Sequence, residues 1–368
     1  MKILVLITKG EIGGAQVFVA NLAKGLKNNL EPEDQVEIAC GEGGFLFNFA
    51  QKEDIKIHKV KSLKRSSGIF SNIKFFFSFI GLIKRNKFDV VHLNSSNTLI
   101  GAISSKIVSR RIKTIFTVHG LSILDPNYQA SFFKKFVYKM FFKFCFIFVD
   151  KVVFVSQNNL DLAKSKKLVK KSYLIYNGVE PNYLDRKESR NFLFNKMGIL
   201  DEGQFLIGSI GRLAYPKNYE FLIENFSDIL QFKPNAKLVL IGDGPEKSKY
   251  EKIIENKGLN DAVFILGEIS DASKYLKGLD LFVLPSIYEG LSISLIEALL
   301  AEVKTIASRV GGNSEIIGDD FCYKLNDIND FIVVLKMILS NDDIFVENKK
   351  EIFIAENMVN NYFSLYRD

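Results

Sequence analysis

Short apolar runs alternate with longer amphipathic stretches along the whole chain. In the first half this pattern predicts strands at residues 3–7, 36–40, 55–60, 90–93, 114–118, 152–155 and 173–175. Most of the segments between these runs are long enough for crossover helices. The rhythm therefore predicts a parallel sheet with helices on both faces.

The second half repeats the rhythm, with strands expected at residues 205–210, 238–241, 263–266, 281–284 and 305–307. One apolar helical face is well marked between the first two of these strands. The sequence NGVEPN and the charged residues after it interrupt the pattern, so we place the seam there. The predicted fold is α/β, with a Rossmann-like domain at residues 1–178 and a second at 179–350. Residues 351–368 are predicted to form a helix that packs back toward the first domain.

Doubly wound sheets bind ligands at the carboxyl ends of their strands. We therefore expect the two domains to face each other across a shared ligand cleft.

The predicted apolar face of the helix after the strand at 205–210 consists of Tyr219, Leu222, Ile223, Phe226, Ile229 and Leu230.

Composition narrows the class of protein only a little. A chain of 368 residues with a net charge of +7 suits an anionic ligand, a nucleic acid or an acidic membrane surface. Three scattered cysteines without a CxxC pair argue against a disulfide framework and a thiolate metal site. The first residues read as a strand, and the apolar runs are too short to span a bilayer. We expect a cytoplasmic protein that is soluble or peripheral on a membrane.

Three segments at strand ends carry candidate chemistry. EIGGAQ follows the first strand, and Gly13 and Gly14 there would expose backbone N–H groups to a phosphate. A tight turn needed only for packing is the alternative. GSIGRLAYPKN places Arg212 and Lys217 where two cations can converge on a pyrophosphate. Two loop cations are more often a solvated surface pair, but their position at a strand end favours function.

The third segment is PSIYEGLSISLIEALLAE, at residues 285–302. We expect a loop through Glu289 and then a helix capped by Ser292. The helical neighbours of Glu297 cannot pair its charge, so a partly buried Glu297 needs an outside partner such as a ribose diol. Alternatively, Glu289 merely favours a helix N-terminus and Glu297 faces water.

This segment resembles a known family. Glu289 and Glu297, within EGLSISLIEAL, match the signature of GT-B-fold retaining glycosyltransferases, most closely glycosyltransferase family 4. The opening ITKGEIGGAQ is similar to bacterial O-antigen and capsule enzymes that extend a sugar on a polyprenyl-diphosphate carrier. The resemblance covers nearly the whole chain, through GGAQ, VVHLNSS, VHG, VSQ, IYNGVE, GRLAYPKN, LVLIGDGPE, LGE and GGNSEII.

The resemblance implies roles for individual residues. Gly13 and Gly14 would approach the donor diphosphate or the acceptor, and Arg212 and Lys217 would neutralise the diphosphate as the sugar leaves. His119 would lie against the transferred sugar. Glu289 and the amides of Gly290, Leu291 and Ser292 would bind the donor sugar, and Glu297 would bind the ribose. Leu266 and Gly267 would frame the base, and Tyr288 is also implied to contact the donor.

The three histidines differ in their expected roles. His119 lies at the carboxyl end of a strand, where it would face the cleft, and we favour it over His92 on another strand. His58 reads as a half-exposed strand residue. One departure from the family pattern is Asn94, where a His or Arg is more common.

Two basic aromatic segments suggest a membrane surface as a partner. SFFKKFVYKMFFKFCFIF, at residues 131–148, carries lysines at four-residue spacing among phenylalanines, and IKFFFSFIGLIKRNK follows Lys61, Lys64 and Arg65. Such helices can lie on anionic membranes. The alternative is a pair of core-packed crossover helices with solvated lysine faces.

Together with these observations, the resemblance implies a metal-independent, retaining glycosyltransferase without a cofactor. It would move a hexose or N-acetylhexosamine from a UDP-sugar to a polyprenyl-diphosphate-linked glycan in O-antigen or capsule synthesis. No Asp-x-Asp pair is present to anchor a metal ion. A GDP-mannose-dependent enzyme is the near alternative, and a UDP-sugar epimerase and a non-enzymatic sugar-nucleotide or nucleic-acid binder are more distant ones. We identify no concentrated basic and aromatic platform in the sequence, so we expect no nucleic-acid partner.

Overall fold

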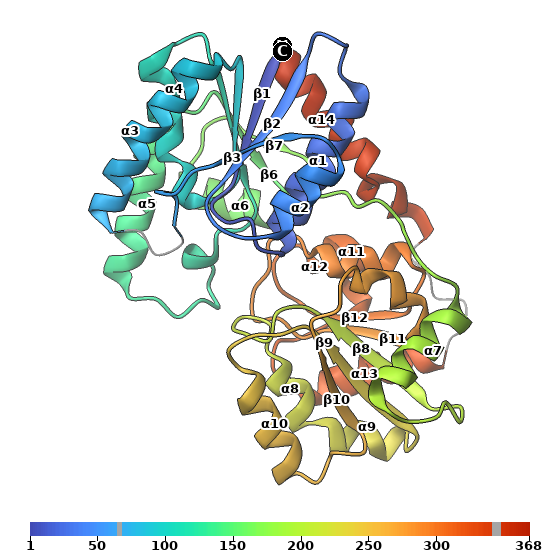
Figure 1. Ribbon diagram of the computed structural model, residues 1–368. Helices are drawn as coiled ribbons and strands as arrows, with labels where there is room; N and C mark the ends of the chain where they lie inside the picture. Colours follow the sequence, from blue (N-terminus) through green and yellow to red (C-terminus); the bar gives the residue numbers. More distant parts are fainter. Residues whose placement is uncertain (65–67, 341–346) are drawn as a thin grey trace. The chain divides into compact units, whose positions relative to one another are not determined.

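The chain folds into two compact units, which are described one at a time. The computed structural model describes residues 1–64, 68–340 and 347–368. Unit 1 comprises Met1–Glu180 and Ile352–Asp368, and unit 2 comprises Pro181–Glu351. The seam lies two residues beyond the expected position. The last helix, α14 (Ala355–Arg367), belongs to unit 1, where it packs against α1 (Gly14–Asn29) (Figure 1).

Unit 1 is built on a seven-stranded sheet in the order β3-β2-β1-β4-β5-β6-β7. All neighbouring strands are parallel. Each strand coincides with an apolar run that the sequence pattern identified. The strands are β1 (Lys2–Leu6), β2 (Gln35–Cys40), β3 (Lys56–Lys59), β4 (Val90–Leu93), β5 (Lys113–Val118), β6 (Lys151–Phe154) and β7 (Tyr173–Leu174).

Alternating side chains of these strands feed two cores. Ile3 and Val5 of β1 face one core, while Leu4 and Leu6 face the other. The first core is covered by α1, α2 (Phe45–Lys52) and α14. The second is covered by α3 (Ile69–Asn86), α4 (Ile100–Val108), α5 (Phe132–Phe146) and α6 (Gln157–Ser165) (Figure 1).

Unit 2 repeats the design with a six-stranded parallel sheet in the order β10-β9-β8-β11-β12-β13. Its last strand is a pair of residues, which is too short to leave a readable pattern, and the sequence did not predict it. The strands are β8 (Phe205–Ile210), β9 (Ala236–Ile241), β10 (Val263–Gly267), β11 (Leu281–Leu284), β12 (Thr305–Ser308) and β13 (Cys322–Tyr323).

The expected amphipathic helix after β8 is two helices. The break falls at Asn225, between α8 (Tyr219–Glu224) and α9 (Phe226–Phe232). The Asn225 side chain donates a hydrogen bond to the Phe221 carbonyl at 2.7 Å, and such bonds compete with the helical ladder. These helices cover one face of the sheet together with α10 (Lys247–Asn256) and α13 (Ile328–Leu339).

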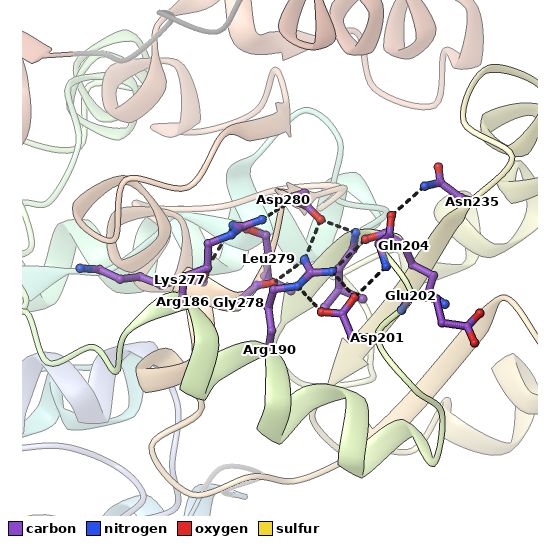
Figure 2. Close-up of polar contacts among 12 residues, drawn as sticks. Arg186, Arg190, Asp201, Glu202, Gln204, Asn235, Lys277, Gly278, Leu279 and Asp280 are labelled. Carbon is purple, nitrogen blue, oxygen red and sulfur yellow. Dashed lines mark hydrogen bonds and ion pairs between the residues drawn. The ribbon is translucent and has the colours of Figure 1, made fainter.

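Helix α7 (Arg186–Met197) packs on the short helix η3 (Ala272–Gly278) and is held by an ion-pair network, which Figure 2 shows. Arg190 donates to Asp280 at 3.0 Å and to Asp201 at 2.7 Å, and Arg186 donates to Asp280 at 2.5 Å. Asp280 also accepts from the Leu206 amide at 2.7 Å. Asp280 and Leu206 stand at the amino ends of β11 and β8, so this network braces the edge opposite to the strands' carboxyl ends.

Both sheets have the doubly wound strand order. In unit 1 the order reverses between β1 and β4, and in unit 2 it reverses between β8 and β11. The loops at the carboxyl ends of such strand pairs diverge to opposite faces of the sheet, which opens a crevice for a ligand. This confirms the predicted α/β doubly wound architecture of each half. It also directs attention to the loops after these four strands.

Candidate functional site

A lysine and a glutamate meet at the crevice of unit 2. The Lys217 ammonium, in the loop after β8, donates to the Glu289 carboxylate, in the loop after β11, at 2.7 Å. The Ser286 hydroxyl donates to the same carboxylate oxygen at 2.7 Å. The two predicted residues are therefore in direct contact, with a serine that the sequence analysis did not single out.

Backbone contacts join the two loops that carry this pair. The Ile287 amide donates to the Pro216 carbonyl at 2.8 Å, and the Asn218 side chain donates to the Pro285 carbonyl at 3.0 Å. The rings of Tyr215 and Tyr288 meet edge to face at 5.8 Å. The corner is thus fixed by the backbone as well as by the ion pair.

A glycine turn after β12 supports the Glu289 loop from behind. Gly311 has a φ of +52°, and a Cβ added there would lie 2.1 Å from the Glu289 carbonyl oxygen. The Gly312 amide donates to the Gly290 carbonyl at 2.9 Å. Only glycine allows this approach at position 311. In the sequence, GGNSEII carried only part of the family resemblance, and neither the turn nor its supporting role was predicted there.

The corner holds positive charge in two different settings. Burial lowers the pKa of Lys217, but the Glu289 carboxylate outweighs burial and the net shift is upward, so Lys217 is cationic. The Arg212 side chain, in the same loop, is exposed. One cation is thus held in place by a carboxylate, and the other reaches solvent at the same strand end.

Helix α11 (Ile293–Leu300) begins directly beyond the Glu289 loop. Ser292 is its N-cap, and its hydroxyl accepts from the Leu295 amide at 3.4 Å, as the sequence predicted. The backbone of Gly290, Leu291 and Ser292 therefore leads into the positive end of the helix dipole.

Glu297 lies in the second turn of α11 and is partly buried. Burial raises the pKa of its carboxyl to about 7, and a hydrogen bond with Ser273 of η3 opposes that shift. The Tyr183 hydroxyl donates to the Glu297 backbone carbonyl at 2.8 Å. As the sequence predicted, the helical neighbours of Glu297 cannot pair its charge, and its hydrogen bond comes from Ser273 on another element.

Leu266 and Gly267 lie at the end of β10, two strands from the Lys217 loop. Both are partly buried, and Gly267 has a φ of +74°. The Gly267 carbonyl accepts from the Gly242 amide at 2.8 Å, which joins the ends of β9 and β10. This places the pair at the carboxyl edge of the same sheet as Glu289.

In unit 1, the paired glycines stand where the predicted turn should be. Gly13 is the N-cap residue and Gly14 the first residue of α1, and no side chain caps this helix start. The Gln16 and Val17 amides bond to the Gly13 carbonyl at 3.0 and 2.9 Å. The loop follows β1, the strand next to the point where the order of the sheet reverses.

His119 follows β5 directly and lies beside the end of β4. Its Nε2 is 3.1 Å from the side-chain oxygen of Asn94. Burial lowers the pKa of His119 to about 3, so the ring is neutral. Because an amide oxygen only accepts, Nε2 carries the proton and Nδ1 keeps its lone pair. His119 can therefore accept a hydrogen bond from a ligand hydroxyl, and the departure from the family pattern at Asn94 orients it.

The other histidines have structural partners. His92 is fully buried, with Nδ1 2.6 Å from the Tyr366 hydroxyl and Nε2 2.7 Å from the Thr117 hydroxyl. It ties α14 to the sheet of unit 1. His58 lies on β3 with Nε2 2.5 Å from Glu37.

Two family models match the chain. Residues 12–183 match "Glycosyltransferase Family 4", and residues 192–355 match "Glycosyl transferases group 1". Among curated proteins, the chain is 25% identical to the Escherichia coli UDP-Gal:alpha-D-GlcNAc-diphosphoundecaprenol alpha-1,3-galactosyltransferase, over 92% of this chain and 88% of that protein. It is 28% identical to the capsular polysaccharide biosynthesis glycosyltransferase CapH of Staphylococcus aureus, over 86% and 83%.

Solved structures share the fold. Sucrose-phosphate synthase from Thermosynechococcus elongatus superposes with a TM-score of 0.82 at 18% identity, covering 100% of this chain and 98% of that one. Anabaena HepE in complex with UDP and glucose gives a TM-score of 0.73 at 20% identity, covering 99% and 95%. These neighbours, the two family models and the two doubly wound sheets agree. The chain is a glycosyltransferase of the GT-B fold and belongs to the glycosyltransferases that combine a family 4 domain with a group 1 domain.

Proposed function

We propose that the protein transfers a hexose or N-acetylhexosamine from a UDP-sugar to a polyprenyl-diphosphate-linked glycan, with retention and without a metal ion. The observation that carries this proposal is the contact between Lys217 and Glu289 at the crevice of unit 2, beside the exposed Arg212. This strand end thus combines two cations, which can bind a diphosphate, with a carboxylate that can accept hydrogen bonds from sugar hydroxyls. Two relatives support the choice of acceptor, because one is named as a galactosyltransferase acting on GlcNAc-diphosphoundecaprenol and the other as a capsular polysaccharide biosynthesis glycosyltransferase.

On the donor side, Lys217 and Arg212 bind the diphosphate and neutralise the charge that grows as the sugar leaves. Lys217 can contact a phosphate oxygen while keeping its bond to Glu289, because an ammonium has three donors. Glu289 accepts from sugar hydroxyls, the backbone from Gly290 to Ser292 lies at the helix start, and Glu297 accepts from the ribose. Leu266 and Gly267 frame the base.

On the acceptor side, the proton of the attacking hydroxyl has to leave without His119. That ring is neutral with a pKa of about 3, so it is a poor base. We infer that His119 holds a sugar hydroxyl through Nδ1 and that a leaving phosphate oxygen takes the proton. Attack from the leaving-group face would then retain the anomeric configuration.

The function is tested by transfer of labelled sugar to a lipid-diphosphate glycan from a panel of UDP- and GDP-sugars. Glu289→Gln and Lys217→Ala should each lower kcat/KM at least 100-fold, which is about 2.7 kcal/mol of transition-state stabilisation. The exposed pair of Lys249 and Glu220 in the same unit offers matched controls, Lys249→Ala and Glu220→Gln.

If only GDP-mannose supported transfer, the UDP-sugar donor of the proposal would be wrong, and the alternative of a GDP-mannose-dependent enzyme would hold. Nucleotide binding without transfer to any lipid-linked acceptor would refute the proposed reaction. Wild-type rates in both site variants would refute the assignment of the site.

We propose an anionic bilayer on the cytoplasmic side as the surface on which the protein works. The outer faces of α3 and α5 expose large apolar side chains, with Phe70 88% and Phe132 86% exposed. Large exposed apolar surface on a monomer marks an interaction site. Lysines accompany these side chains, and Arg65 of the same basic region lies outside the described residues. Along the described parts of the chain, no helix is long and apolar enough to cross a membrane.

Flotation with phosphatidylcholine vesicles, with and without phosphatidylglycerol, tests this surface. Phe136→Gln combined with Phe144→Gln removes two half-exposed rings from α5 and should reduce flotation at least fivefold. Val333→Gln is a matched control, because Val333 is 63% exposed on a helix of unit 2. Equal flotation with both vesicle types would refute an electrostatic contact.

A further inference from the structure

An apolar groove runs along α5 in unit 1. It lies between α5 and the short helix η2 (Ser122–Leu124) and has a volume of about 390 Å³. The lining contains one charged residue, at its border, and no acidic one. The groove is lined by Ile123, Phe133, Lys134, Val137, Tyr138 and Phe141.

The groove shares two strand ends with His119. Ile123 follows His119 by four residues in the loop after β5. Tyr138, on the other wall, hydrogen-bonds at 3.0 Å to the hydroxyl of Ser96, which stands two residues beyond Asn94 after β4. Because Asn94 contacts His119, the apolar groove and the histidine belong to neighbouring loops of one sheet edge.

The two walls differ in how firmly they are held. Tyr138 is partly buried, and burial raises the pKa of its hydroxyl to about 12 against the effect of the Ser96 hydrogen bond. Phe133 and Val137 are 74% and 48% exposed on the outer side of the groove. The groove therefore has a hydrogen-bonded inner wall and an exposed apolar outer wall, and an apolar ligand that covers the outer wall removes apolar surface from water.

The surroundings of the groove are apolar at one side and basic at the other. Phe136 and Phe144 of the same helix do not line the groove but are also half exposed, so α5 presents further apolar surface beside it. At the border, Lys134 lies over the ring of Tyr128 at 5.8 Å, and Lys135 donates to the Asp125 carbonyl at 3.4 Å. A ligand that suits both sides has a hydrocarbon chain joined to an anionic group.

We propose that this groove binds the hydrocarbon chain of the lipid acceptor, at the isoprene units nearest the diphosphate. The inference rests on the proposed function, and it names the part of unit 1 that selects a lipid-linked acceptor. Burial of the chain against Val137 and Phe133 supplies affinity, because each buried methylene leaves water. The lysines beside the groove meet the negative charge of the diphosphate.

Acceptor kinetics in detergent separate this groove from the bilayer surface. The glycan diphosphate is compared with a polyprenyl chain and with a short alkyl chain, at saturating donor. Phe133→Gln combined with Val137→Gln should raise the KM for the polyprenyl acceptor at least tenfold, leaving the KM for the short-chain acceptor within twofold. The matched control is Phe232→Gln combined with Val333→Gln, which changes two exposed apolar residues of unit 2 and should leave both KM values within twofold.

Each outcome decides the proposal. An unchanged polyprenyl KM in the groove variant, or an equal rise in the unit 2 control, would overturn the groove as a chain site. A rise in KM for both acceptors alike would also overturn it, because the change would then not concern the chain. If the wild-type protein transferred sugar to neither acceptor, the proposed function would fail instead. A photoreactive group in the first isoprene unit should label the peptides of η2 and α5, and labelling confined to other segments would contradict the proposal.

Discussion

The ionisation of Glu297 gives a quantitative test of the donor site. Its carboxyl is partly buried in α11, and burial raises its pKa to about 7, against an ordinary value of 4.5, although Ser273 donates to it. Proton loss below pH 7 is therefore easier in the unfolded chain than in the folded one. The charged form destabilises the ligand-free fold.

The size and the pH window follow from these two pKa values. The difference between a pKa of 4.5 and one of about 7 corresponds to about 3 kcal/mol, as an upper figure for a partly buried group. The raised folded-state pKa means that stability is lost as the pH rises from about 4.5 to 7 and stays lost above it. Glu297→Gln, which keeps a neutral side chain of similar shape, should raise the free energy of unfolding by about 2–3 kcal/mol at pH 8 and by little at pH 4.5.

Ligand binding should show the opposite dependence. If ionised Glu297 accepts from the ribose hydroxyls, UDP affinity in the wild type should fall up to tenfold per unit as the pH drops below 7. Urea unfolding between pH 4.5 and 8 measures the first effect, and calorimetric titration with UDP measures the second. Glu251→Gln, at an exposed glutamate of α10, is the control for loss of a carboxylate.

Two results would refute the reasoning. One is a destabilised Glu297→Gln variant at pH 8, which would mean that the carboxylate is stabilised in the ligand-free fold. The other is a variant that binds UDP as tightly as the wild type at pH 8, which would separate Glu297 from the ribose.

Three further predictions concern the rest of the chain. Asp280→Ala should lower the free energy of unfolding, measured in urea, by about 2–4 kcal/mol, because Arg190 and the Leu206 amide lose a shared acceptor. Asp243→Ala, in an exposed loop, is the control, and an equal loss of stability there would contradict the role of the network. His119→Gln should lower kcat at least tenfold. Because the His119 ring is already neutral, the pH–rate profiles of the wild type and the variant should have the same shape. A limb near pH 6.5 that is present in the wild type and lost in the variant would contradict this. Transfer in excess EDTA should stay within twofold of the untreated rate, and a complete loss restored by Mg²⁺ or Mn²⁺ would contradict a diphosphate held by side-chain cations alone.

Sequence periodicity located the sheet strands because parallel strands buried on both faces read as short apolar runs. It failed where a local contact decided the outcome. The helix after β8 breaks at Asn225, whose side chain donates to the Phe221 carbonyl, and a helical wheel does not contain that information. The two residues of β13 are likewise too few to carry a period.

For the site, the sequence supplied residues and strand ends but not their pairing. Lys217 and Glu289 are far apart along the chain, and they meet because β8 and β11 are neighbours in the sheet. Strand order depends on contacts that are distant in the sequence, so only the family resemblance suggested that these two residues belong to one site. His92 shows the same limit, because its partner Tyr366 comes from a helix that returns to unit 1 from the end of the chain.

The two crevices differ in charge in a way that fits the proposed reaction. At the edge of unit 2, the contact between Lys217 and Glu289 fixes the position of the lysine ammonium, so in the proposed reaction a diphosphate would meet a charge that is already oriented. At the edge of unit 1, His119 and Asn94 are neutral, and Nδ1 of the histidine can only accept a hydrogen bond. A neutral edge leaves the phosphate as the stronger base, which is the condition for proton transfer to the leaving group on the face of attack.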